Sequence, residues 1–189
     1  MDRQEAKDIA IAMLILTISF KNIFFGVSSF SLQTFLISFF LIVPAFLFHE
    51  LMHRQVAKKF NYLARFKRWD FGLFLCFLTS FLGFIFAAPG AVVIYPVYHY
   101  HFSPALQRKA GKYISFSGPL ANLILAAIFL ILYLSYSNIL FKYAFFINTW
   151  FALFNLLPIP PLDGFKLFFA DRKLWAVAFS LALVLYFFS

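Results

Sequence analysis

Long apolar runs separated by short polar segments dominate the pattern of this chain. A helix needs roughly 20 apolar residues to cross a bilayer, and most of these runs approach or reach that length. The polar segment at residues 28–33 predicts a turn, and the prolines within residues 158–161 predict a helix end, since proline cannot continue a helix. We expect membrane-crossing helices at about residues 9–30, 34–58, 113–136, 143–156 and 174–188.

The apolar stretch at residues 71–88 is long enough for a further crossing, but the charges around it argue against one. Basic clusters stay on the cytoplasmic side of a membrane, and they occur both before this stretch, at residues 54–68, and after it, at residues 108–112. The chain between them must therefore cross an even number of times. Residues 91–95 are β-branched and aromatic, which predicts a strand. We therefore expect a re-entrant element here, which needs protein or a cavity to satisfy its backbone.

These patterns predict an all-α polytopic membrane protein of about five to six transmembrane helices, with a small membrane-embedded β-element. We expect one domain over residues 1–189. The basic clusters place the N-terminus in the cytoplasm and predict a multi-pass protein of the cell membrane.

The amino-acid composition is typical of an integral membrane protein. The hydrophobic share is 63% and the charged share 12%, against about 45–50% and about 25% in soluble domains. A net charge of +9 is also found in nucleic-acid-binding proteins, but the basic residues here lie at the ends of apolar runs, where we expect them to contact anionic headgroups. We therefore expect no nucleic-acid partner. The single cysteine excludes an intramolecular disulfide and a cysteine-based metal site.

The sequence His49-Glu50-Leu51-Met52-His53 places an HExxH motif inside the second apolar run. Ionisable side chains are costly in hydrocarbon and seldom occur there without a function. On a helix the two histidines are one turn apart and share a face, so both can bind one Zn²⁺ ion. Glu50 lies beside them, where it can act as general base on a water. A polar network between helices is the alternative interpretation of these three residues.

Catalytic zinc usually has three protein ligands, so a third must come from elsewhere. Of the seven acidic residues, three are N-terminal, two lie among basic residues and Glu50 is the expected base. Asp163 remains, at the end of a broken helix that runs toward the cytoplasm, although it could instead be a turn carboxylate. Counting back from Lys58 at 1.5 Å per residue puts the two histidines about 7–14 Å below the cytoplasmic end of their helix. We therefore expect one zinc ion in the cytoplasmic half of the bilayer.

Four segments resemble, in order, the motifs of the site-2 protease family of intramembrane zinc metalloproteases. They are FHELMH at residues 48–53, APGAV at 88–92, SGPLAN at 117–122 and NLLPIPPLDG at 155–164. The chain resembles a minimal form of the family, without PDZ or CBS domains, and the catalytic core would span about residues 34–170. The resemblance implies an intramembrane zinc endopeptidase, whose substrates are transmembrane helices of membrane-anchored proteins.

The resemblance also implies roles for individual residues. His49, His53 and Asp163 would bind zinc, and Glu50 would activate the water. Asn155 would hold the substrate or a loop, although it could merely cap the broken helix.

The strand that contains Val92 and Val93 would pair with an unwound substrate segment by strand addition.

Other interpretations are open at this point. A metal-ion transporter would also place histidine and aspartate in the membrane, but it would not need Glu50 and more often shows pseudo-symmetric halves, which we do not find. A catalytically silent relative that binds membrane helices is disfavoured by the intact ligand and base positions. His99 and His101 share one face of an extended segment, where interfacial anchoring is commoner than a second metal site. The sequence indicates no particular oligomeric state.

Overall fold

The protein is mostly helical, with one small sheet, in a computed structural model that describes residues 2–86, 88–96 and 103–189. Its elements are α1 (Arg3–Phe25), α2 (Leu32–Lys59), β1 (Tyr62–Arg68), α3 (Asp70–Ser80), β2 (Gly90–Pro96), α4 (Pro104–Tyr136), α5 (Ile139–Asn155), α6 (Asp163–Ala170) and α7 (Arg172–Phe188). By length and composition α1, α2 and α4 can cross a membrane, while α3 and α5 are shorter apolar helices. The predicted helical membrane fold with a small β-element is confirmed.

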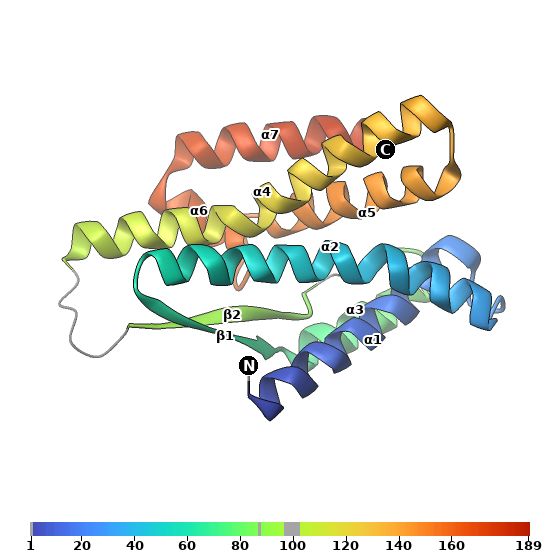
Figure 1. The fold of residues 1–189 in the computed structure, drawn as a ribbon, viewed down its shortest axis with the longest axis horizontal. Helices are drawn as coiled ribbons and strands as arrows, with labels where there is room; N and C mark the ends of the chain where they lie inside the picture. Colours follow the sequence, from blue (N-terminus) through green and yellow to red (C-terminus); the bar gives the residue numbers. More distant parts are fainter. Residues whose placement is uncertain (1, 87, 97–102) are drawn as a thin grey trace.

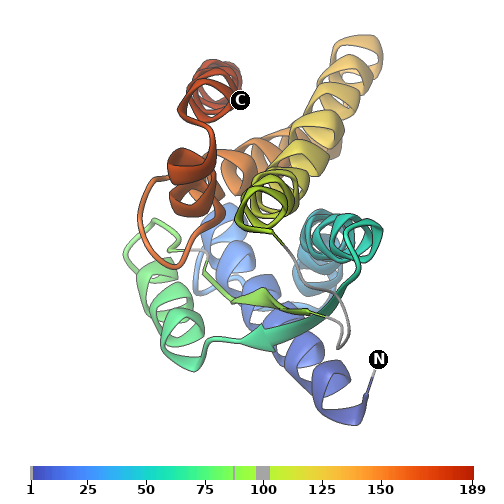
Figure 2. The ribbon, with the colours of Figure 1, turned by 90° about the vertical axis from the view of Figure 1, so that its left-hand side faces the viewer.

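The long helices run side by side along the molecule, and the sheet lies against them (Figure 1). Helix α4 packs between α2 and α5, and α5 packs against α7. Viewed from the end, the sheet lies between α1 on one side and α2 with α4 on the other (Figure 2). This arrangement brings the predicted zinc-binding helix α2 into contact with α4 and with both strands.

Helix α3 matches the prediction that the apolar stretch after residue 70 is not a full crossing. It has 11 residues, so at 1.5 Å per residue it is about 16 Å long, roughly half the thickness of the hydrocarbon core. The chain then turns and continues into β2, which begins one residue earlier than predicted and ends at Pro96. A short helix followed by a strand fits a re-entrant element.

Strand β1 is one element that the sequence analysis missed, and helix α6 is another. The strand pairs antiparallel with β2, from Tyr62 opposite Pro96 to Arg68 opposite Gly90. Its basic side chains led us to interpret residues 54–68 as a headgroup anchor alone. The buried side chain of Phe66, which packs edge-on against Phe46 of α2, is what attaches the strand to the core.

The N-terminal acidic residues tie α1 to this basic segment. Asp2 pairs with Arg65, and Glu5 pairs with Arg54, the residue that follows His53. Glu5 also accepts a hydrogen bond from the Phe66 N–H of β1 at 2.9 Å. The Glu5 and Arg54 side chains are only 5% and 18% exposed, against 54% and 43% for Asp2 and Arg65. Glu5 is therefore the anchor that holds α1, α2 and β1 together beside the candidate site.

Glu5→Gln is expected to lower the free energy of unfolding by about 3–5 kcal/mol, because the Arg54 charge then stays partly buried without its carboxylate. Thermal unfolding of the purified protein in detergent measures this. Asp2→Asn is the matched control, since its ion pair is exposed and asparagine can still cap α1; its expected effect is at most about 1 kcal/mol. Equal shifts for the two variants would contradict the role of Glu5.

Candidate metal centre

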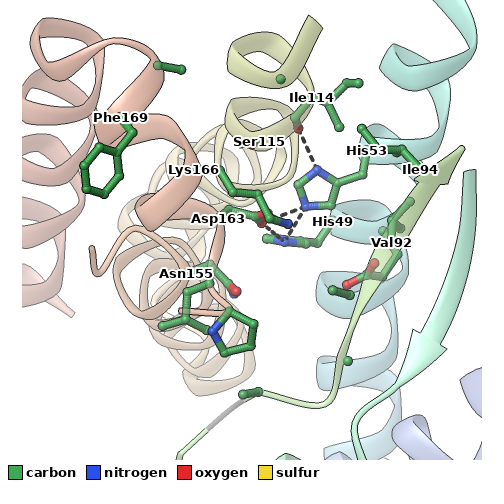
Figure 3. A pocket seen from close by; sticks show the side chains of 18 of the residues that line it. His49, His53, Val92, Ile94, Ile114, Ser115, Asn155, Asp163, Lys166 and Phe169 are labelled. Atoms are coloured by element: carbon green, nitrogen blue, oxygen red, sulfur yellow. Dashed lines mark hydrogen bonds and ion pairs between the residues drawn. The ribbon is translucent and has the colours of Figure 1, made fainter. Parts of the chain in front are cut away.

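Three predicted ligand side chains meet at one point of the structure. His49 and His53 lie one turn apart on α2, and Asp163 is the first residue of α6. The two Nε2 atoms are 3.0 Å apart, and Asp163 Oδ2 lies 3.2 Å from His49 Nε2 and 2.8 Å from His53 Nε2. All three side chains are largely buried, and their ligand atoms converge (Figure 3). This is a cluster of donors that can hold one metal ion.

The position of Asp163 corrects one detail of the sequence analysis. It does not end α5, the helix that was predicted to run toward the cytoplasm, but begins α6, which was not predicted. The start of α6 lies directly against the end of α5: a Cβ on Gly164 would come within 2.1 Å of the Leu156 carbonyl oxygen. Only glycine fits so close a contact, and this contact places the neighbouring Asp163 against α2.

The hydrogen bonds behind the histidines leave the facing nitrogens free for a metal. His49 Nδ1 lies 2.6 Å from Asn122 Oδ1, and His53 Nδ1 lies 2.7 Å from the Ile114 carbonyl oxygen. Both partners accept, so each Nδ1 carries the proton and each Nε2 presents a lone pair. This is how metal-binding histidines are commonly oriented.

The spacing of the donor atoms also fits zinc. Tetrahedral zinc at about 2.0–2.1 Å from each nitrogen or oxygen separates the ligand atoms by roughly 3.3 Å. The observed separations of 2.8–3.2 Å would open by a few tenths of an ångström to admit the ion. Two histidines and one carboxylate are a ligand set of catalytic zinc sites, with a fourth position left for water.

Gly118 on α4 keeps the space beside the ligands open. A Cβ at this position would lie 2.3 Å from His53 Nε2 and 2.6 Å from His49 Nε2. Any larger residue would therefore push the two ligand atoms out of place. In the sequence analysis this glycine is part of the SGPLAN segment of the family resemblance, but its contact with the metal ligands was not predicted.

Glu50 stands next to the cluster. It lines the same cavity as His49 and His53, and its Oε2 atom is buried without a hydrogen-bond partner among the described residues. An unpaired buried carboxylate oxygen is costly unless something binds it. A water held at the fourth position of the metal would supply that partner.

The cavity in front of the cluster has a volume of about 580 Å³. Asn155 and Val92 line it, and Arg108 and Lys166 give it two positive charges. The role of Asn155 and Val92 in substrate binding stays a prediction. Val93 does not line it but faces a separate pocket beside Asp8 and Arg65. His99 and His101 lie outside the described residues.

Among the described residues, β2 pairs only with β1, and its other edge faces this cavity. The last pair of the sheet is Arg68 opposite Gly90. Directly after it, the Trp69 N–H donates to the Pro89 carbonyl oxygen, so Trp69 and Pro89 form a bonded pair. Opposite residues of antiparallel strands alternate between bonded and non-bonded pairs, so the odd-numbered residues of β2 bond to β1. The even-numbered residues Gly90, Val92 and Ile94 turn their N–H and C=O groups to the free edge, and all three line the cavity, as does Ala91.

The sequence analysis missed Asn122 and the Ile114 carbonyl as partners of the histidines. Asn122 lies in the SGPLAN segment that contributed to the family resemblance, so its position was noted without a role. Only the packing of α4 against α2 reveals what it contacts. The Ile114 carbonyl is a main-chain group, which every residue has, so no residue type in the sequence indicates its role.

Gly118→Ala is expected to abolish stoichiometric zinc binding, because its new methyl group would occupy the space of the ligand nitrogens. Metal analysis of the purified protein measures this. Gly111→Ala on the same helix is the matched control, since no atom of the described residues lies within 4 Å of its Cβ position. A Gly118→Ala protein with one bound zinc would show that the ligand cluster is not where the ion binds.

Two known proteins are similar to this chain. "Putative zinc metalloprotease MJ0611" of Methanocaldococcus jannaschii is 40% identical over 159 residues, which are 81% of this chain and 80% of the relative. "Putative zinc metalloprotease YwhC" of Bacillus subtilis is 34% identical over 151 residues, which are 67% of this chain and 64% of the relative. No family model and no solved structure matches. Since the first relative is alike over most of both chains, this chain belongs to the same family of zinc metalloproteases.

Proposed function

We propose that this zinc metalloprotease is an intramembrane endopeptidase of the site-2 type, which hydrolyses peptide bonds within or near transmembrane helices of membrane-anchored proteins. The observation that carries the proposal is the location of the donor cluster. His49, Glu50 and His53 lie on α2, a 28-residue helix that is long and apolar enough to cross a membrane. A protease of soluble substrates would have no reason to bury its ligands in such a helix, where polar groups are costly.

The charges support an orientation with the N-terminus in the cytoplasm. Arg54, Lys58 and Lys59 lie at the end of α2, and Arg108, Lys109 and Lys112 lie at the start of α4. These two ends lie at the same end of the molecule (Figure 1), and basic clusters favour the cytoplasmic side. We therefore place the metal centre in the cytoplasmic half of the bilayer of a multi-pass cell-membrane protein.

The residues around the cavity supply the steps of hydrolysis. Zinc held by the three ligands would act as a Lewis acid toward water and the peptide carbonyl. The Glu50 carboxylate takes a proton from the attacking water as the water oxygen adds to the carbonyl carbon. It then gives this proton to the leaving nitrogen as the C–N bond breaks. Asn155, whose Nδ2 donates to the Phe151 carbonyl at 2.9 Å, presents its amide to the cavity beside this reaction.

The free edge of β2 offers a way to hold the substrate. A transmembrane helix hides its backbone in internal hydrogen bonds, so its peptide bond is accessible only after local unwinding. The freed N–H and C=O groups then need partners, because little water is present to bind them. Val92 and Ile94 line the cavity near the histidines (Figure 3), and the pairing of β2 with β1 turns their backbone groups to the free edge. We propose that an extended substrate segment pairs with this edge by strand addition.

Val92→Pro tests the edge directly, because it removes one N–H that faces the cavity and none that bonds to β1. Proline is tolerated at such edge positions. We expect kcat/KM for a membrane-anchored substrate to fall about 2- to 10-fold, which corresponds to the loss of one hydrogen bond. The zinc content should stay unchanged. Val92→Thr keeps the N–H and the shape of the side chain and should cleave normally. Full activity of Val92→Pro would exclude pairing at this position.

Glu50→Gln tests the proposed reaction. The amide cannot accept the proton, so we expect cleavage of a transmembrane substrate in lipid vesicles to fall by about 10²–10⁴-fold, while the protein still binds zinc. The measurement is cleavage by the purified wild type and variant at equal metal content. Equal cleavage by the two proteins would reject Glu50 as the base, and a wild type that cleaves only soluble peptides would reject the intramembrane activity.

A further inference from the structure

A buried amide on α4 stands directly behind one of the two histidine ligands. The Asn122 side chain is fully buried, and its Oδ1 atom lies 2.6 Å from His49 Nδ1. Its Nδ2 atom donates to the Ala45 carbonyl and to Asn148 Oδ1, each at 3.0 Å. The amide therefore joins α2, α4 and α5 at the back of the metal centre.

The second asparagine fixes the orientation of the first. Asn148 Nδ2 donates to the Ala144 carbonyl at 2.8 Å within α5, so Asn148 Oδ1 must face Asn122. Asn122 then has two acceptors in front of its nitrogen. A flipped amide would set its oxygen against both of these acceptors and lose both bonds. The Asn122 oxygen is therefore held toward His49, which must donate from Nδ1.

The two histidine ligands differ in how they are held. His53 donates to the Ile114 carbonyl, a main-chain group that no substitution removes. His49 depends on a side chain, and that side chain depends on another. A side-chain relay can be changed one residue at a time, so its effect on the metal can be measured.

We propose that Asn122 and Asn148 form a positioning relay that fixes the tautomer and ring orientation of His49 and thereby sets the affinity of the centre for zinc. The relay rests on the metal centre of the proposed function and not on the class of substrate. Asn122 is a positioning residue, because it acts through His49 and does not face the cavity. Groups in this position typically change metal affinity by about 10–100-fold.

The test measures the zinc dissociation constant of the purified full-length protein by competition with a chelator, without any substrate. We expect Asn122→Ala to bind zinc about 10- to 100-fold more weakly. Asn148→Ala should weaken binding in the same direction but less, because His49 keeps its partner. The variant with both changes should match Asn122→Ala alone, since residues that act through one path are not additive.

Thr149→Val is the matched control in the same layer of α5. Thr149 is also fully buried, and its hydroxyl has no hydrogen-bond partner in the part of the chain that is described. This variant should bind zinc like the wild type. The visible absorption bands of the Co²⁺-loaded protein should shift in Asn122→Ala and stay unchanged in Thr149→Val, because these bands report the geometry of the ligands.

Two results would overturn the relay. One is wild-type zinc affinity in folded Asn122→Ala. The other is a combined variant whose loss equals the sum of the two single losses. If Asn122→Ala does not fold, Asn148→Ala alone decides, and an unchanged zinc affinity there counts against the relay. Because no substrate is involved, these outcomes are independent of whether the enzyme cleaves transmembrane helices.

Discussion

Burying polar groups in an apolar bundle is costly unless they find hydrogen-bond partners, and this requirement organises the region around the metal centre. His49 and His53 each give one nitrogen to an acceptor on α4, which leaves the other nitrogen for the ion. Gly118 on the same helix leaves the space that the ligands need. Helix α4 is thus a structural partner of the site although it supplies no ligand. The packing of α2 against α4 and the chemistry of the centre depend on the same contacts.

The same requirement explains the sheet. A two-stranded sheet has two edges, and each exposes unpaired backbone groups. On β1 the Phe66 N–H is satisfied by Glu5 of α1. On β2 the backbone groups of Val92 and Ile94 are left facing the cavity. The edge of β1 is therefore bound by α1. The edge of β2 is free, and this is where we propose that an unwound substrate finds hydrogen-bond partners.

The features that could be predicted are those that depend on residues close together in the sequence. His49, Glu50 and His53 could be identified because residues four apart on a helix share a face, and Asp163 because so few acidic residues remained. The start of α6 at Asp163 depends on the contact between Gly164 and the end of α5, which no local pattern encodes. Strand β1 was missed because its basic residues resemble a membrane anchor and its partner lies far along the chain. The role of Asn122 could not be predicted, because it depends on how α4 is aligned against α2.

The central claim is that one zinc ion, held by His49, His53 and Asp163, drives peptide hydrolysis in the membrane. The most direct measurement is to remove all metal from the purified protein in lipid vesicles and to add zinc stepwise while following cleavage of a membrane-anchored substrate. Activity should be absent at first, rise in proportion to zinc and level off at one equivalent. Cleavage by the metal-free protein, or a plateau at two equivalents, would contradict the account.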